Sequence, residues 1–322
     1  MKVAVLNNRK PKSPSADVPD DAYEEFDSDE TIDAIVAAIE TLGISAVPVD
    51  IAPGFLEHLK SFDFVFNIAE GEGGRCREAI PAAVCELLNL RYTGSDPLTL
   101  AVTLDKTIAR RLVSPDVPVA RAATTRDELA DLSYPVIVKP NAEGSSKGIR
   151  RASFCLDRSA AQAQADWVSA NYACPALVEE YLPGAEVTVG IAGNGRDVRV
   201  LGMMEVAPAS SEGEPFVYSL EVKRDFRSRV LYFTPPRLPD ATIAAIRGYA
   251  LRAYELLGCR DIARIDFRLN SSGMPCFLEC NPLPGLNPES SDLVIATSGT
   301  LSYTQLVSGI LRDAAERYGY AL

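Results

Sequence analysis

The segment IARIDFRLNSSGMPCFLECN, residues 262–281, decides the fold, because it joins two strand-like runs through the turn signal NSSG. Alternation along a strand places Arg264 and Asp266 on one face of the first run. The same rule places Glu279 and Asn281 together on one face of the second run. Carboxylate and amide oxygens on adjacent strands suit Mg²⁺. A surface ladder of charged cross-strand pairs, such as Arg264 with Glu279, is the alternative interpretation.

Composition excludes several classes of protein. A chain of 322 residues suits two or three packed lobes. The net charge of −12 argues against nucleic acid or an anionic membrane as the main partner. The single histidine, His58, argues against a Ser-His-Asp hydrolase and a histidine-based zinc site. Without a signal-peptide pattern at the start or an apolar run of membrane-spanning length, we expect a cytoplasmic protein.

Three lobes are predicted along the chain, in a fold that mixes α/β and α+β parts. Residues 1–97 alternate strand and helix patterns, which indicates a Rossmann-like lobe with a parallel sheet. Residues 98–183 open with a helix over 98–113 and form a small central α+β lobe. Residues 184–322 combine strand-like runs with a helix over 240–258, which is typical of a mixed, mainly antiparallel lobe.

A small-residue loop follows the apolar strand that ends in Lys139. In VIVKPNAEGSSKG, residues 136–148, this loop offers backbone N–H groups, and Lys147 adds positive charge. Such a loop can close over a triphosphate while Lys139 reaches a phosphate. The Walker A and G-x-G-x-x-G patterns are absent from it, and an ordinary solvated turn is the alternative.

A second segment can form a hinge that binds a base. In ALVEEYLPGAEVTV, residues 176–189, a strand leads into LPG, whose backbone groups can pair with an adenine edge. Glu186 is then close enough to contact ribose hydroxyls. The alternative is a solvated acidic face made of Glu179, Glu180 and Glu186.

Together these segments resemble the ATP-grasp enzymes, and within them the D-alanine–D-alanine ligase family. The matching segments occur in the family's order and spacing, and they are YTGSDPLTLAVTLDK (92–106), YPVIVKPNAEGSSKG (134–148), LVEEYLPGAEVTV (177–189) and ARIDFRLNSSGMPCFLECNPLPGLNPESS (263–291). The resemblance implies a three-lobed ATP-grasp fold. It also implies an ATP-dependent carboxylate–amine ligase that joins two amino-acid-like substrates through an acyl phosphate and releases ADP and phosphate.

The resemblance implies a role for each matching residue. The positions that match ATP contacts are Lys106, Lys139, Ser145, Ser146, Glu179, Tyr181, Leu182, Glu186 and Lys223. The positions that match magnesium ligands are Asp266, Glu279 and Asn281. The positions that match catalytic groups are Arg264, Gly285, Lys223 and Ser145. Ser290 matches a serine that binds a substrate carboxylate. The implied cofactors are ATP and two Mg²⁺ ions, with Mn²⁺ as a substitute.

The same resemblance implies a mobile segment and a segment that binds the substrate. Lys223 lies in a loop over residues 210–228, which we expect to act as a lid that excludes water from the acyl phosphate. The family's N-terminal glutamate, which holds the ammonium of the first D-alanine, has no direct match in the acidic loop over residues 6–30. Glu24, Glu25 and Asp27 are the candidates to replace it.

Three further substitutions lie on the substrate side. Glu70 stands where the family has histidine, Arg75 where it has glutamate, and Arg224 where a tyrosine follows the lid lysine. Arg75 and Arg224 are suited to an extra carboxylate or phosphate on the substrate. Alternatively, they pair with Glu70, Glu72 or Asp225. The departures favour a ligase with altered substrates.

Two other functions are consistent with this sequence. One is true D-alanine–D-alanine ligase activity in cell-wall synthesis. The other, of a different class, is a nucleotide-binding regulatory protein without catalysis, which the presence of Arg264, Asp266, Glu279 and Asn281 argues against. The expected partners are small amino-acid-like molecules, with no nucleic acid and no membrane. Related enzymes are often homodimers, although the sequence itself indicates no interface.

Overall fold

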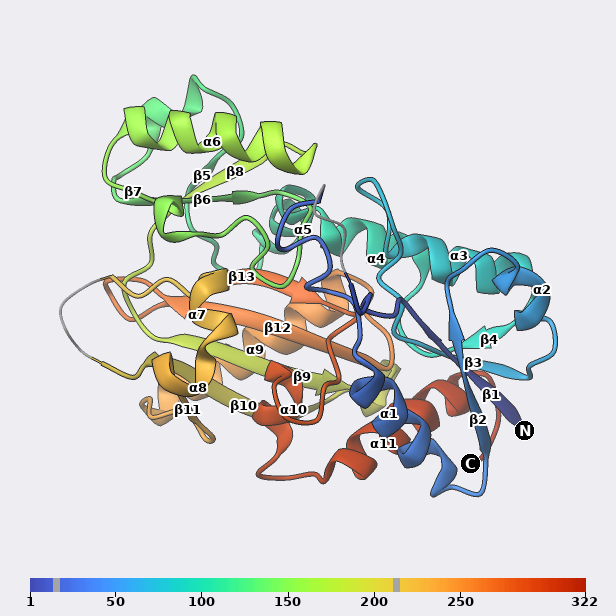
Figure 1. Cartoon of the computed structure of the whole chain (residues 1–322). Coiled ribbons are helices and arrows are strands. Elements are labelled where there is room, and N and C mark those ends of the chain that lie inside the picture. The colour runs from blue at the N-terminus through green and yellow to red at the C-terminus, as the bar shows by residue number, and fades with distance from the viewer. Residues whose placement is uncertain (14–17, 211–214) are drawn as a thin grey trace.

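The computed structural model describes residues 1–13, 18–210 and 215–322, and its strands form three sheets (Figure 1). The first sheet is parallel throughout, in the order β2-β1-β3-β4. Its strands are β1 (Lys2–Asn7), β2 (Ser45–Asp50), β3 (Phe64–Asn67) and β4 (Arg91–Tyr92). The helices along this part of the chain are α1 (Asp29–Glu40), α2 (Phe55–Leu59) and α3 (Ala79–Leu87).

This sheet confirms the predicted Rossmann-like arrangement and positions two loops. The buried residues Val3, Val5, Phe64 and Phe66 pack with apolar residues of α1 on one face of the sheet. β1 and β3 are parallel neighbours, so their carboxyl ends lie at the same edge. The loops that leave these ends carry Glu25 and Glu70. Ligands bind at the carboxyl edge of such sheets.

The central sheet is small and antiparallel, in the order β5-β8-β6-β7. Its strands are β5 (Ala122–Ala123), β6 (Val136–Pro140), β7 (Phe154–Cys155) and β8 (Ala176–Glu180). The helices of this part are α6 (Arg158–Tyr172) and the short 3₁₀ helices η1 (Glu128–Asp131) and η2 (Arg151–Ser153). Ala161 and Val168 of α6 pack against Val136, Val138 and Val178 of the sheet.

The third sheet is antiparallel, in the order β11-β10-β9-β12-β13. Its strands are β9 (Glu186–Ala192), β10 (Arg199–Pro208), β11 (Val230–Phe233), β12 (Ile262–Leu269) and β13 (Pro275–Asn281). The helices are α7 (Leu220–Arg224), α8 (Phe226–Arg229), α9 (Asp240–Leu256), α10 (Asp292–Thr297), α11 (Tyr303–Arg317) and the 3₁₀ helix η3 (Gly195–Asp197). Buried residues of α9 pack on β9 and β12, so this part matches the mainly antiparallel lobe expected from the sequence.

The run over 98–113 was expected to form one helix but forms two. They are α4 (Pro97–Leu104) and α5 (Lys106–Val113). Asp105 between them is extended, with φ −82° and ψ 96°, and its carboxylate accepts a hydrogen bond from the Ile108 N–H at 3.0 Å. A side-chain cap of this kind starts a new helix. The break fixes Lys106 at the first position of α5.

The parts of the chain share a core. Ile32, Ile35 and Ile39 of α1 pack with Leu306 and Ile310 of α11 in one cluster, and Figure 1 shows the two helices side by side. Each sheet lies within one of the ranges 1–97, 98–183 and 184–322, which stay a prediction as domain limits. Among the described residues, none of the helices combines the length and the apolar character that a membrane crossing requires.

Candidate active site

Two adjoining cavities contain almost all the residues that the sequence singled out. Cavity A, with about 1020 Å³ of empty space that includes its opening to solvent, lies between the central and C-terminal sheets. Its walls include Lys106, Lys139, Ser145, Ser146, Glu179, Tyr181, Leu182, Glu186, Lys223, Arg264, Asp266 and Glu279. Cavity B, of about 1310 Å³, has walls that include Glu25, Glu70, Ser145, Lys223, Arg224, Arg264, Asn281, Gly285 and Ser290. Ser145, Lys223 and Arg264 line both cavities, so the two meet at these residues.

The β12–β13 pair brings four polar residues together in the predicted way. Asp266 lies opposite Glu279, and Arg264 lies opposite Asn281. The Arg264 guanidinium donates to Asp266 Oδ2 at 3.0 Å and to Glu279 Oε1 at 3.3 Å. Thr188 on β9 donates its hydroxyl to Asp266 Oδ1 at 2.8 Å. The cross-strand ion pair of the alternative interpretation therefore exists, and it lies in a cavity wall.

The donor set at this pair fits magnesium. Asp266, Glu279 and Asn281 offer only oxygen atoms, which Mg²⁺ prefers. Burial raises the pKa of Asp266 to about 6, although Arg264 acts against the rise. Burial also acts to raise the pKa of Glu279, but the charges of Lys106 and Arg264 outweigh it and leave this pKa at about 2. Glu279 is therefore an anion at neutral pH.

Two buried lysines converge on acidic partners in cavity A. The Lys106 ammonium lies 3.3 Å from Glu279 Oε2, and Lys139 on β6 forms an ion pair with Glu179 on β8. Arg110 on α5 bonds the other oxygen of Glu179. Burial would raise the pKa of Glu179, but the charges of Lys139 and Arg110 hold it below the usual value. With both carboxylate oxygens engaged, Glu179 positions Lys139.

The end of β8 provides one unused backbone donor. The Tyr181 N–H donates to the Pro135 carbonyl at 3.0 Å. Within the described chain, the Leu182 N–H makes no hydrogen bond, so it is available to a ligand in cavity A. Of the two backbone positions that the resemblance assigns to adenine, Leu182 is the one with a free N–H.

Sequence reasoning missed Arg268, which lines cavity A beside Glu186. Its guanidinium donates to Glu186 Oε2 and to the Tyr181 hydroxyl, each at 3.1 Å, and to the Phe216 carbonyl at 2.6 Å. Burial raises the pKa of Glu186 to about 7. Arg268 lies on the same face of β12 as Arg264 and Asp266, so strand alternation could have predicted that it faces the cavity.

The loop after β6 contains two serines in a left-handed backbone conformation. Ser145 and Ser146 have φ values of 49° and 58°, in the left-handed region that non-glycine residues rarely occupy. The Ser146 hydroxyl donates to the Tyr218 carbonyl at 3.0 Å. The Gly144 N–H donates to Glu25 Oε1 at 2.9 Å. The N-terminal loop and the segment before α7 thus hold this loop between the two cavities.

The predicted lid is described only in part, because residues 211–214 of it lie outside the described residues. Lys223 is on α7, with its ammonium 3.7 Å from Asp292 Oδ2. Arg224 donates to Asp20 Oδ2 at 2.8 Å and to Glu24 Oε1 at 2.7 Å. Residues 14–17 of the acidic N-terminal loop also lie outside the described part. The described part of this loop bonds directly to the lid through Arg224.

The residues predicted to bind the substrate do not all lie in the same cavity. Glu25 lies in cavity B and accepts hydrogen bonds from Arg77, a residue that the sequence did not single out, at 2.7 and 2.9 Å. Arg75 instead donates to Asp105 at 2.7 Å and lines a different cavity, so the structure does not bring it to this site. Its partner is none of the acids that the sequence suggested, because the loop turns it toward the start of α5.

The remaining groups of cavity B suit an oxyanion and a polar substrate. Within the described chain the Gly285 N–H makes no hydrogen bond, which leaves it free to donate. The Ser290 hydroxyl donates to Asn287 Oδ1 at 2.9 Å and is exposed. Asp292, another residue that sequence reasoning missed, lines both cavities with its carboxylate 3.6 Å from the Arg264 guanidinium.

Comparison with known proteins places this geometry in a family. The family described as D-ala D-ala ligase C-terminus matches residues 108–312. A D-alanine–D-alanine ligase from Bordetella petrii is 33% identical over 288 residues, covering 86% of this chain and 84% of its own. An uncharacterized protein, y4sG, from Sinorhizobium fredii is 32% identical over 302 residues, covering 89% and 88%.

The fold agrees with solved structures. The crystal structure of D-alanine–D-alanine ligase from Bacillus anthracis complexed with ATP superposes with a TM-score of 0.77 at 19% identity, covering 99% of each chain. This likeness confirms the ATP-grasp fold that the sequence predicted. The chain belongs to the D-alanine–D-alanine ligase family, a family of ATP-dependent ligases.

Proposed function

We propose that this protein is an ATP-dependent carboxylate–amine ligase that joins two amino-acid-like substrates, with a substrate pocket changed from that of D-alanine–D-alanine ligases. The observation that carries the proposal is the meeting of cavities A and B at Ser145, Lys223 and Arg264. ATP in cavity A and the reacting carboxylate and amine in cavity B are then adjacent. The kinship with enzymes named D-alanine–D-alanine ligases supports this assignment.

Asp266, Glu279 and Asn281 are the residues that would hold Mg²⁺. When bound, the metal would neutralise phosphate charge during phosphoryl transfer. Lys106 and Lys139 line cavity A and supply positive charge for the same phosphates. Lys223 reaches the border of both cavities from the lid. Two ions, or Mn²⁺ as a substitute, are part of the proposal.

The reaction that fits this arrangement has two steps. One substrate carboxylate attacks the γ-phosphorus of ATP, the bond from that phosphorus to the bridging oxygen breaks, and ADP leaves. The amine of the second substrate attacks the acyl phosphate carbon, the carbon–oxygen bond to phosphate breaks, and the amine loses a proton. The Arg264 guanidinium and the Gly285 N–H are the donors for the oxyanion. Removal of one such donor typically costs about 10²–10³ in rate.

The changed residues of cavity B favour substrates other than two D-alanines. Arg224 bonds to Glu24 and Asp20 where the family has tyrosine, and Glu70 occupies the family's histidine position. Cytoplasmic location and a homodimer stay predictions.

The test is amino-acid-dependent ADP release with Mg-ATP, using pools of D- and L-amino acids and mass detection of the products. An amide other than D-alanyl-D-alanine, formed together with ADP, supports the proposal. D-Alanyl-D-alanine as the main product would mean that cavity B rebuilds the usual pocket with different residues. ADP release without an amide product would contradict ligation.

A further inference from the structure

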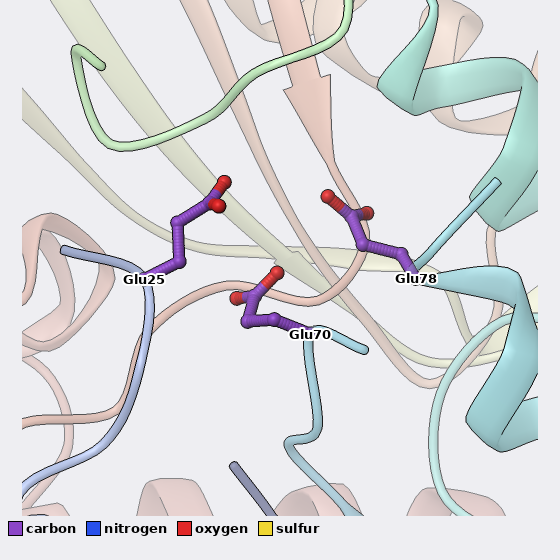
Figure 2. A group of neighbouring side chains, drawn as sticks. All are labelled: Glu25, Glu70 and Glu78. Atoms are coloured by element: carbon purple, nitrogen blue, oxygen red, sulfur yellow. The ribbon is translucent and has the colours of Figure 1, made fainter. Parts of the chain in front are cut away.

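Three glutamates converge in cavity B, and they are called here the carboxylate trio: Glu25, Glu70 and Glu78. One carboxylate oxygen from each lies within 4.8 Å of the other two. Figure 2 shows the three side chains pointing toward one another from separate segments of the N-terminal part. A point at the centre of a triangle with such sides is about 2.8 Å from each corner, the length of a charge-assisted N–H···O hydrogen bond.

Only one member of the carboxylate trio has strong partners. Glu25 accepts hydrogen bonds from Arg77, from the Gly144 N–H and from Lys147, the last at 3.2 Å. Glu78 is 7% exposed and accepts no hydrogen bond from the described residues. Its nearest cation is Arg77, at 3.9 Å. A buried carboxylate without donors is costly, so Glu78 indicates a missing positive ligand.

The same is true of two further acids of cavity B. The carboxylates of Glu70 and Asp27 accept no hydrogen bond from the described residues. Burial raises the pKa of Asp27 to about 7 and raises that of Glu70 well above its usual value, where the charge of Glu78 adds to the effect. Glu70, Glu78 and Asp27 therefore have no hydrogen-bonded cation among the described residues, although the charge of Arg77 lies near Glu70 and Glu78.

Three cations in the wall of cavity B pair with acids other than Glu70, Glu78 and Asp27. Arg224 bonds to Glu24 and Asp20. Lys223 and Arg264 face Asp292, and Arg264 also bonds to Asp266 and Glu279. Lys10 also lines cavity B, but it is exposed, and its ammonium forms no hydrogen bond or ion pair with the described residues. Arg224, Lys223 and Arg264 therefore leave Glu70, Glu78 and Asp27 without a direct ion pair, and a cationic ligand in cavity B would provide one.

We infer that cavity B binds a diamino acid, whose two ammonium groups are held by the carboxylate trio and Asp27. An amino acid with a neutral side chain brings one ammonium and leaves at least two of the three acids unmatched. A second amine on the side chain supplies another positive charge and three more N–H donors. The inference rests on the proposed ligase function and names its substrate class.

The test compares diamino acids with neutral amino acids of matched length in the ADP-release assay. Lysine, ornithine and 2,4-diaminobutyrate are set against norleucine, norvaline and 2-aminobutyrate, each in both chiral forms. At least one diamino acid is expected to have a kcat/KM about tenfold or more above its neutral match. Equal or better use of the neutral amino acids would overturn the inference and leave the ligase function standing. No ADP release with any amino acid would overturn both.

Matched variants locate the effect. Glu70→Gln and Glu78→Gln are expected to remove the preference for the diamino acid, because kcat/KM should fall about tenfold further for the diamino acid than for its neutral match. Glu72→Gln, on the exposed neighbouring turn, is the control that should keep the preference. Both active-site variants should melt no lower than the parent, because each removes an unmatched buried charge. A preference unchanged in both would overturn the inference.

A metal ion is the competing occupant of the carboxylate trio. Titration of the nucleotide-free protein with Ca²⁺ or Mn²⁺ distinguishes it. Binding that is lost in Glu78→Gln and kept in Glu279→Gln would assign the trio to a metal and overturn the inference. Absence of such binding, together with the diamino acid preference, supports it.

Discussion

Asp266 and Glu279 lie directly opposite each other on β12 and β13, and Arg264 donates a hydrogen bond to each carboxylate. The three residues thus tie the predicted magnesium ligands to the predicted oxyanion donor. In the proposed reaction, a cation that binds these carboxylates would compete with Arg264 for them and would leave the guanidinium more available to the substrate carbonyl.

The first prediction concerns Glu279. Glu279→Gln keeps the size of the side chain but removes its charge, so we expect turnover to fall by about 10³ or more, while the nucleotide still binds. Steady-state ADP release and nucleotide titration measure the two effects. Glu255→Gln is the control, since this exposed residue pairs, within the described ranges, only with Arg252 on the same helix and should keep full activity. Turnover in Glu279→Gln near the parent value would rule out the assigned role.

The second prediction concerns magnesium. If Asp266 and Glu279 hold the ion, ATP with Mg²⁺ should stabilise the protein more than ATP with a chelator. A ligand at one hundred times its Kd contributes about 2.7 kcal/mol. Thermal melts of the parent and Asp266→Asn test this, and the magnesium-dependent increment should disappear in the variant. An equal increment in both proteins would contradict the ligand assignment.

The third prediction is a pH dependence caused by Glu78. Burial raises its pKa from 4.5 to about 7, because the charged form is disfavoured in the folded protein. The stabilising effect of the protonated form is therefore complete below about pH 4.5 and is lost as pH rises through about 7. As pH rises from 5 to 8, the parent should therefore lose on the order of 2 kcal/mol of unfolding free energy relative to Glu78→Gln, whose side chain does not titrate. Denaturant unfolding at both pH values measures it, and a constant difference would contradict the assigned environment.

The fourth prediction concerns the contact between lid and N-terminal loop. Arg224→Gln removes the ion pairs with Asp20 and Glu24, so we expect the KM for the amino substrate to rise about three- to tenfold. ADP release without amide formation should also rise, because water reaches the acyl phosphate more easily. Arg227→Gln is the matched control, since Arg227 is exposed and pairs with Glu289 outside the loop contact. Identical behaviour of the two variants would argue against a closing role for Arg224.

Local patterns predicted most of the fold and the β12–β13 part of the candidate site. The pairing of Asp266 with Glu279 followed from strand alternation and one hairpin, which are both local rules. The break at Asp105 was missed because the apolar spacing of α4 continues into α5, so that only the capping side chain marks the boundary.

The substrate side depended on contacts that no local rule specifies. Arg77 bonds Glu25 across 52 positions, and Arg75 bonds Asp105 across 30. Arg77 meets Glu25 because the loops leaving β1 and β3 lie at one edge of a sheet, whereas Arg75 meets Asp105 at the junction of α4 and α5. The direction in which each charged side chain points depends on loop conformation. Glu78 carried no sequence signal, since its importance arises from the absence of a partner.

The most direct test of the proposed function follows one oxygen atom. Amino-acid pools labelled with ¹⁸O in the carboxylate are supplied with Mg-ATP, and the released phosphate is analysed by mass. Because the carboxylate oxygen that attacks the γ-phosphorus leaves with the phosphate, the account predicts one ¹⁸O in the phosphate for each amide formed. ADP release accompanied by unlabelled phosphate would contradict carboxylate activation and the ligase reaction with it.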